Sequence, residues 1–257
     1  MMTRIRPLIL VVNDDGIDSS GIKLLTESMH EIGDVFVVAP NVNRSGSAHS
    51  MTLHEDIFIE KTNKDFNYFT CSGTPVDCVK SAVNTILPRI PDLCVSGINH
   101  GSNHSINSLY SGTLHGAMEG TIQGIPSIAF SHLNYSERIN LIPFKAVIKR
   151  ISLEVLQQGF SPGITLNVNF PNIDFNKIKG VKLCKQGSGF WKENFKLIKK
   201  EHNKSYYRIT GKFRYDKNDV NTDSWALVNK WISIVPISIN CTVPINFNEL
   251  KYLEYDF

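Results

Sequence analysis

Residues 8–16 read LILVVNDDG, and this stretch decides how the first half of the chain is interpreted. Its first five residues are an uninterrupted apolar run with three β-branched side chains, which is typical of a strand buried on both faces of a parallel sheet. Asp14 and Asp15 follow almost directly. We therefore expect both carboxylates at the carboxyl end of a first strand, the edge at which open α/β sheets bind ligands.

Two adjacent carboxylates repel each other unless a cation or a proton offsets their charge. Carboxylate oxygens are ligands of hard divalent cations, so Asp14 and Asp15 predict a metal site. Asp-Asp-Gly is also ordinary turn chemistry, and a solvated turn is the alternative that this stretch alone leaves open.

Composition fits one α/β domain, with or without an appendage: the chain has 257 residues, of which 42% are hydrophobic and 20% charged. A net charge of +3 is too small to argue for a nucleic-acid partner. Five scattered cysteines without a CxxC pair indicate neither a zinc ribbon nor a redox dithiol. No apolar run approaches the roughly 18 residues of a membrane span, and no signal-peptide pattern is present. We expect a cytoplasmic protein with reduced thiols and no membrane partner.

Beyond the first strand, apolar strand-like segments alternate with segments of helical periodicity. This βαβ alternation predicts a Rossmann-like, mostly parallel sheet flanked by helices, with right-handed crossovers. Gly33 is expected to cap the first helix at its carboxyl end. The expected helices are 19–32, 74–86 and 113–123; the expected strands are 35–39, 92–96 and 125–130, with a strand pair at 56–60 and 66–70.

The second half is less regular. A protruding β-hairpin is predicted for residues 185–213, which are polar, basic and aromatic; exposed aromatics on such an arm indicate a subunit contact, and a satellite core is the alternative. Nine lysines against two acids lie between residues 177 and 204, which we interpret as a solvated face rather than a nucleic-acid patch. Pro236 places a strand at the sheet edge. The remaining expected elements are a helix at 146–158, strands at 164–169 and 231–239, and a terminal helix at 246–255.

We interpret residues 1–257 as a single domain, with a Rossmann-like catalytic core at 1–131 and the extended arm at 185–213.

Four segments that follow predicted strands carry carboxylates, amides and hydroxyls, and a parallel sheet gathers such loops at one edge. Such hard oxygen donors suit Mg²⁺, Mn²⁺ or Ca²⁺ and do not suit zinc. The segments are NDDG at 13–16, NRSGS at 43–47, SGIN at 96–99 and YSGT at 110–113.

Ser111, Gly112 and Thr113 open a predicted helix, whose free N–H groups would seat a phosphate; an ordinary Ser/Thr cap is the alternative. Arg44 is a candidate phosphate clamp, with a surface arginine beside a turn as its alternative. Neither a Walker A loop nor a GxGxxG fingerprint is present.

Five motifs, in this order, closely resemble the SurE survival-protein family of 5′-nucleotidases. The resemblance is dense over residues 8–131 and weaker beyond. The motifs are VNDDGIDSSGI, VVAPNVNRSGSAHSMTL, GTPVDCVKSAVN, PDLCVSGINHGSN and LYSGTLHGAMEGTIQGIPSIA.

The resemblance implies a metal-dependent phosphatase that hydrolyses nucleoside 5′-monophosphates, with 3′-nucleotides and short polyphosphate as further candidate substrates. It implies one divalent cation per subunit and a homodimer or homotetramer assembled through the C-terminal part. The metal ligands would be Asp14, Asp15, Ser45 and Asn99, with Asp14 and Asp15 also catalytic. The phosphate contacts would be Asn43, Arg44, Ser111, Gly112 and Thr113.

For hydrolysis we expect in-line attack by water oriented by Asp14 or Asp15, with a phospho-aspartyl intermediate as the rival. The sequence departs from the family pattern at residues 101–107, which carry no carboxylate. That departure motivates the alternative of a catalytically impaired nucleotide-binding or regulatory oligomer. Four histidines in or beside the loops are interpreted mainly as polar loop residues, with assistance to the leaving group by one of them as the alternative. They are His49, His100, His104 and His115.

Overall fold

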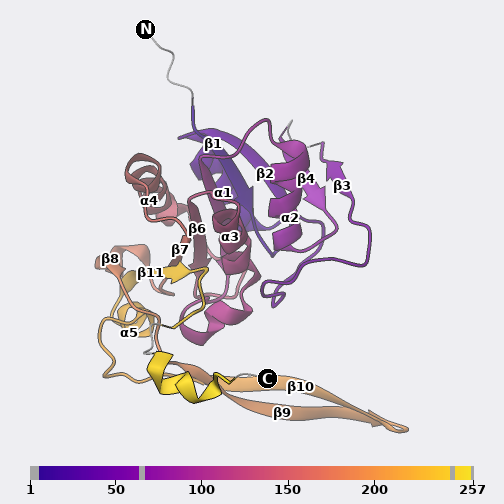
Figure 1. Cartoon of the computed structure of the whole chain (residues 1–257), viewed down its shortest axis with the longest axis vertical. Coiled ribbons are helices and arrows are strands. Elements are labelled where there is room, and N and C mark those ends of the chain that lie inside the picture. The colour runs from indigo at the N-terminus through magenta and orange to yellow at the C-terminus, as the bar shows by residue number, and fades with distance from the viewer. Residues whose placement is uncertain (1–5, 64–66, 244–246, 256–257) are drawn as a thin grey trace.

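A nine-stranded sheet lies at the centre of the molecule, with helices on both of its faces and a separate two-stranded hairpin beside it (Figure 1). The computed structural model describes residues 6–63, 67–243 and 247–255. The strand order is β3-β4-β2-β1-β5-β6-β7-β11-β8. From β4 to β7 in this order, every neighbouring pair of strands is parallel. The antiparallel pairs of the sheet are β3 with β4 and β11 with β7. The predicted α/β class with a mostly parallel sheet is confirmed.

Eight of the nine strands of the sheet match expected segments apart from their ends, and the strand at residues 180–183 was not predicted. In chain order they are β1 (Leu8–Val12), β2 (Asp34–Pro40), β3 (Ile59–Lys61), β4 (Tyr68–Cys71), β5 (Leu93–His100), β6 (Ser127–His132), β7 (Ile164–Phe170), β8 (Gly180–Leu183) and β11 (Trp231–Ser238). Among the predicted strands, the largest difference at an end is in β5, which runs four residues past its predicted end. Phe66, where one strand was expected to begin, lies outside the described residues.

Strand β1 sits between β2 and β5, and all five of its residues are buried. Its continuous apolar sequence follows from this position, because both faces of the strand are covered and neither can carry polar side chains. Residues 13–16 therefore emerge at the carboxyl edge of the sheet, next to the carboxyl end of β5.

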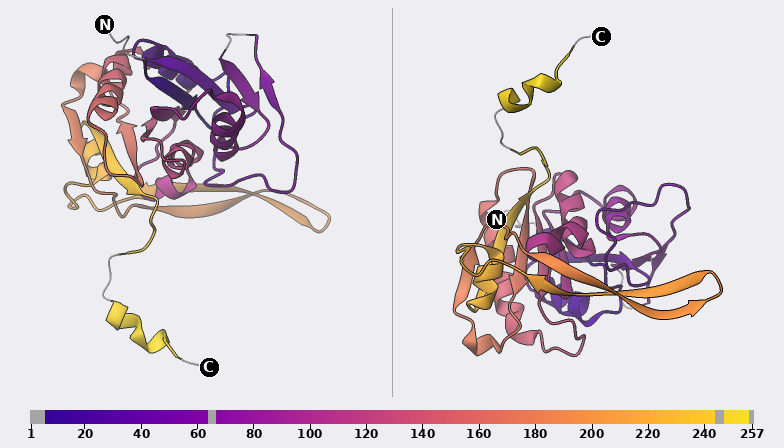
Figure 2. Two further views of the ribbon diagram at one scale, coloured as in Figure 1. Left: turned by 45° about the horizontal axis from the view of Figure 1, so that its top comes forward. Right: turned by 90° about the horizontal axis from the view of Figure 1, so that it is seen from below.

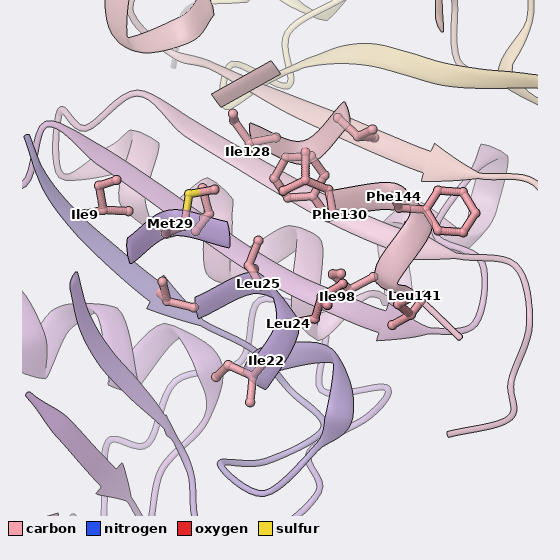
Figure 3. Packing of buried hydrophobic residues seen from close by; sticks show 14 of the residues in the cluster. Ile9, Ile22, Leu24, Leu25, Met29, Ile98, Ile128, Phe130, Leu141 and Phe144 are labelled. Carbon is pink, nitrogen blue, oxygen red and sulfur yellow. The ribbon is translucent and has the colours of Figure 1, made fainter. Parts of the chain in front are cut away.

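The helices cover the sheet in two pairs. Helices α1 (Ser20–His30) and α4 (Lys145–Gln158) contact each other, and α2 (Pro75–Ser81) contacts α3 (Gly112–Ile122). The larger apolar cluster includes Met29 of α1, Phe130 of β6 and Phe144 at the start of α4 (Figure 3). Burial of such large side chains supplies most of the free energy that holds helices on a sheet.

The two ends of α1 differ in how well they match the prediction. The Ser19 hydroxyl accepts a hydrogen bond from the backbone N–H of Ile22, so α1 begins as its sequence predicts. Its carboxyl-terminal cap is Glu31 rather than Gly33. Gly33 instead packs closely on the sheet, because a Cβ there would lie 2.5 Å from the carbonyl oxygen of Pro7.

Strand β11 lies between β7 and β8, so the prediction that it is an edge strand is wrong for the strand as a whole. Pro236 itself pairs with Leu166 of β7, whereas the pairing with β8 ends at Ile234. The proline therefore occupies a locally unpaired side of the strand, where its missing N–H costs no ladder hydrogen bond.

Residues 190–214 form the predicted hairpin, from β9 (Phe190–Glu201) and β10 (Lys204–Arg214). The hairpin begins five residues later than expected and extends as an arm past the body of the molecule (Figures 1 and 2). All residues of β9 are exposed, so the alternative of a satellite core is wrong.

The end of the described chain is a short 3₁₀ helix, Phe247–Leu253, where a terminal helix was expected over 246–255. Asn246 lies outside the described residues. In both views of Figure 2 this helix lies apart from the sheet. Within the described ranges, every helix is too short or too polar to cross a lipid bilayer.

Candidate active site

The carboxyl ends of β1 and β5 meet the 41–58 connection and the start of α3 around a cavity of about 250 Å³. Four residues predicted to act on substrate or metal line this cavity: Asp14, Ser45, Asn99 and Ser111. They come from four separate segments of the sequence. The rest of the lining comprises Gly46, His100, Gly101, Ser102, Asn103, Asn107, Tyr110 and Tyr135.

Asp14 is buried against the first turn of α3, where its side chain is only 3% exposed. The Thr113 hydroxyl donates a short hydrogen bond to Oδ1 of Asp14. Gly112 permits this approach, because a Cβ there would lie 2.8 Å from both Cβ and Oδ2 of Asp14. The positive end of α3 therefore lies against the Asp14 carboxylate. Gly112 and Thr113, predicted as phosphate contacts, are in contact with Asp14.

The environment of Asp14 raises the pKa of its carboxyl group from 3.8 to about 6. Burial is the main cause, the negative charge of Asp15 adds to it, and the hydrogen bond from Thr113 opposes it. Because burial and a like charge both disfavour the ionised form, the site has a deficit of positive charge that a proton or a cation would offset.

Asp15 lies beside the cavity and contacts His100. The backbone N–H of His100 donates to Oδ2 of Asp15, and ring atom Nδ1 lies 3.3 Å from the same oxygen. On the other side of the ring, Nε2 lies 3.2 Å from the Ser20 hydroxyl. His100 therefore links the second carboxylate to α1, a contact that the loop-residue interpretation missed.

Ser45 belongs to a turn that is fastened to the end of β1. The backbone N–H of Arg44 donates to the carbonyl oxygen of Asp14 over 2.7 Å, and that of Ser45 donates to Oδ1 of Asn43 over 2.8 Å. Asn43 thus shapes the turn that presents Ser45.

The Arg44 guanidinium points to another part of the fold. Its Nη2 donates to the carbonyl oxygen of Ser72 over 2.5 Å, and Arg44 is not part of the cavity lining. The structure therefore does not bring the Arg44 side chain together with the other predicted phosphate contacts.

The donor atoms around the cavity fit a hard divalent cation. The amide nitrogen of Asn99 donates to the carbonyl oxygen of Gly101 over 2.8 Å, which leaves the amide oxygen as its remaining polar atom. The Ser47 hydroxyl lies beside Gly112, is buried, and has no hydrogen-bond partner among the described residues. A buried hydroxyl without a hydrogen-bond partner, close to a carboxylate whose negative charge is not neutralised, is expected where a bound ligand would complete the contacts.

The described part of the chain contains no group of three or more His, Cys, Asp or Glu side chains able to hold a metal ion. The oxygen donors at the cavity are instead two carboxylates with neutral hydroxyl and amide groups. This mixture is suited to Mg²⁺, Mn²⁺ or Ca²⁺, which accept neutral oxygen ligands.

One lining residue, Tyr135, lies outside every segment singled out from the sequence, and the lining residues of segment 101–107 were noted only as a departure from the family pattern. Tyr135 follows β6. The other loops were selected because they follow the carboxyl ends of parallel strands, and the same criterion would also have selected Tyr135. Asn103 is fixed by hydrogen bonds to Asn169 and Ser131.

Comparison with known proteins gives one consistent result. The family model described as Survival protein SurE matches residues 9–193. The chain is 47% identical to 5′-nucleotidase SurE of Flavobacterium johnsoniae over 96% of both chains, and 39% identical to 5′-nucleotidase SurE of Bacteroides fragilis over 97% of this chain and 98% of that protein. The crystal structure of the SurE protein from Aquifex aeolicus is similar with a TM-score of 0.85 and 39% identity, over 96% of this chain and 99% of that chain.

Proposed function

Because this chain belongs to the SurE family, we propose that it is a 5′-nucleotidase, which hydrolyses nucleoside 5′-monophosphates to nucleoside and phosphate. The names of the relatives support this proposal. The observation that carries it is the cavity itself, around which Asp14, Ser45 and Asn99 converge from three distant segments. The proposal extends to 3′-nucleotides and short polyphosphate, which present the same phosphoryl group.

Asp14, Asp15, Ser45 and Asn99 would hold one divalent cation of the Mg²⁺, Mn²⁺ or Ca²⁺ type. When bound, such a cation supplies positive charge that polarises a phosphoryl oxygen and stabilises the transferring group. Its charge would also offset the two effects that raise the pKa of Asp14, burial first and the negative charge of Asp15 second.

The chain's own residues divide into binding and positioning roles. Ser111 lines the cavity at the start of α3, where the helix end favours negative phosphoryl oxygens. Gly112 and Thr113 position Asp14, and Asn43 and Arg44 position Ser45 through the backbone contacts of their turn.

Asp14 or Asp15 would orient a water molecule for in-line attack on phosphorus and accept its proton. The oxygen of that water forms the new bond to phosphorus while the bond to the ester oxygen breaks, and the departing ester oxygen takes up a proton from solvent to give the nucleoside hydroxyl. The contact between Asp15 and His100 fixes the orientation of the second carboxylate during this step.

Phosphate release from a panel of nucleoside monophosphates tests the proposal, with Mg²⁺, Mn²⁺ or EDTA added. We expect metal-dependent release by the wild-type protein, and a loss of about a hundredfold or more in Asp14→Asn and Asp15→Asn. Asp56→Asn is the matched control, because Asp56 is an exposed carboxylate of the 41–58 connection. Wild-type turnover in both site variants would contradict the assignment of the carboxylates.

The alternative is a catalytically impaired nucleotide-binding or regulatory oligomer. It rests on the carboxylate-free segment 101–107, four of whose residues line the cavity. Absence of phosphate release from every substrate with every metal would favour it.

A further inference from the structure

An aromatic side chain stands at the rim of the candidate active site without a role in the chemistry proposed above. Tyr135 lines the same cavity as Asp14 and Asn99, yet 67% of its surface is exposed. A large ring that is both exposed and adjacent to a polar ligand cavity has an open surface on which a planar ligand can pack.

The ring is held in place by its contact with Gly101. A Cβ built on Gly101 would lie 2.6 Å from Cε1 and 2.9 Å from Cδ1 of Tyr135, so the ring packs directly on the backbone of Gly101. The N–H of Gly101 donates to the carbonyl oxygen of His132 over 2.9 Å, which fixes Gly101 against the end of β6. One part of the Tyr135 ring is thus supported by backbone.

The loop that carries Tyr135 is fixed on both sides of it. The N–H of Asn134 donates to Nδ1 of His132 over 3.0 Å, and the N–H of Ser136 donates to Oδ1 of Asn134 over 2.8 Å. The amide nitrogen of Asn134 also donates to Asn172 over 3.1 Å. This network orders the backbone around Tyr135 before any ligand binds, which lowers the entropic cost of binding.

We propose that Tyr135 is the stacking platform for the nucleobase of the substrate, a role that rests on the proposed 5′-nucleotidase function. The polar part of the cavity takes the phosphate, and the base, joined to it through the sugar, reaches the rim where Tyr135 is exposed. Every base has an aromatic face, so a stacking platform accepts all four bases and favours the larger purines.

Steady-state kinetics with two substrates tests the platform, because ribose 5-phosphate offers the same phosphate and sugar without a base. In Tyr135→Ala we expect KM for AMP to rise about tenfold, as for the loss of one base stack. KM for ribose 5-phosphate stays at its wild-type value. Tyr135→Phe keeps the ring and retains the wild-type preference for AMP over ribose 5-phosphate.

Two variants serve as controls. Ile142→Ala removes an equally exposed side chain seven residues along the same connection, 67% exposed but outside the cavity, and leaves both KM values unchanged. Tyr110→Ala removes the other exposed tyrosine of the cavity, 62% exposed, and compares the two rings directly.

The inference is overturned if Tyr135→Ala raises both KM values equally, or if only Tyr110→Ala loses the preference for AMP. Failure of the proposed function looks different, because the wild-type protein would then release phosphate from neither substrate. In that case calorimetric titration with AMP still decides: tighter binding by the wild type than by Tyr135→Ala supports the platform, and equal binding overturns it.

Discussion

The Asp14 carboxylate occupies an environment that favours its neutral form. Its pKa of about 6 exceeds the ordinary value of 3.8 because the group is buried and faces Asp15. Without a cation, ionisation of Asp14 therefore opposes folding. The same feature makes metal binding dependent on pH, because the cation competes with a proton for the carboxylate at pH values below about 6.

Asp14→Asn is expected to stabilise the metal-free protein at neutral pH. The folded protein holds the Asp14 proton more tightly than the unfolded chain, so the unfolding free energy falls as pH rises from 3.8 through 6. A shift of this size corresponds to at most about 3 kcal/mol above pH 6. Urea unfolding in EDTA at pH 4 and pH 7.5 measures it. The prediction fails if the variant loses stability across this pH range as steeply as the wild type.

Ionisation of His132 makes the unfolding free energy depend on pH in the opposite direction to that of Asp14. Burial and the nearby His100 lower the pKa of its imidazole from 6.5 to about 4, and its Nδ1 accepts a hydrogen bond from the N–H of Asn134. A proton on Nδ1 would break that hydrogen bond. The unfolding free energy therefore falls as pH drops from 6.5 towards 4, by about 3 kcal/mol in total.

Replacement of His132 by glutamine tests this contribution, because the amide oxygen can accept a hydrogen bond and the group does not titrate. Urea unfolding at pH 7 and pH 4.5 should show a smaller loss of stability in the variant than in the wild type. An identical loss in both proteins would show that other groups cause the acid sensitivity.

At the scale of elements, the 101–107 segment owes its conformation to parts of the chain far away in sequence. The N–H of Ser105 donates to Oδ2 of the buried Asp223, at the start of α5 (Asp223–Val228), and the hydroxyl of Ser105 donates to the carbonyl oxygen of Gly187. Asp223 also accepts a hydrogen bond from the N–H of Gly187. A carboxylate from α5 thus orders a segment that has none of its own.

The base of the arm makes a further contact with this segment. Nε1 of Trp191 donates to Oδ1 of Asn107 over 2.6 Å, and the amide nitrogen of Asn107 donates to the Ser102 hydroxyl. Asn107 and Ser102 both line the candidate active site. Strand β9 therefore holds one wall of the cavity.

Trp191→Phe removes the donor and keeps an aromatic ring at the base of the arm. We expect KM for nucleoside monophosphates to rise about fivefold, the effect of losing one hydrogen bond of about 1 kcal/mol. Phe195→Leu is the control, since Phe195 lies further along the same strand. Light scattering checks that both variants keep the wild-type oligomeric state. An unchanged KM in Trp191→Phe would show that the contact does not order the cavity.

At the scale of the whole molecule, the arm is amphipathic. Directly paired residues share one face of a hairpin. The pairs Phe195 with Ile209 and Leu197 with Tyr207 therefore give one apolar face, while Lys196 with Arg208 and Asn194 with Thr210 give a polar one. The four apolar side chains are 44–63% exposed. An apolar face left in solvent along an extended arm favours the predicted contact with another subunit.

Assembly through this face is a prediction that the double variant Phe195→Ser/Ile209→Ser tests. We expect the wild type to be a dimer or tetramer by light scattering, and the variant to dissociate at concentrations where the wild type does not. The control is Asn194→Ser/Thr210→Ser on the polar face. A variant with the wild-type mass at every concentration would exclude the apolar face of the arm from the subunit interface.

Much of the fold could be predicted because its signals are local. The apolar run of β1 and the caps at Ser19 and Thr74 each specify an element through neighbouring residues alone. The parallel sheet then gathers the loops that follow its strands, which places Asp14, Ser45, Asn99 and Ser111 around one cavity.

Tertiary structure alone decided the contacts that complete the site. Trp191 and Asn107 are 84 residues apart, and Ser105 and Asp223 are 118 apart. Tertiary structure also decided the position of β11 inside the sheet and the packing of Tyr135 on Gly101. No local pattern encodes such pairs, because they depend on strand order, register and the packing of distant segments. The sequence by itself therefore determined the sheet, its ligand-binding edge and the candidate metal ligands, and the folded chain determined what surrounds and orients them.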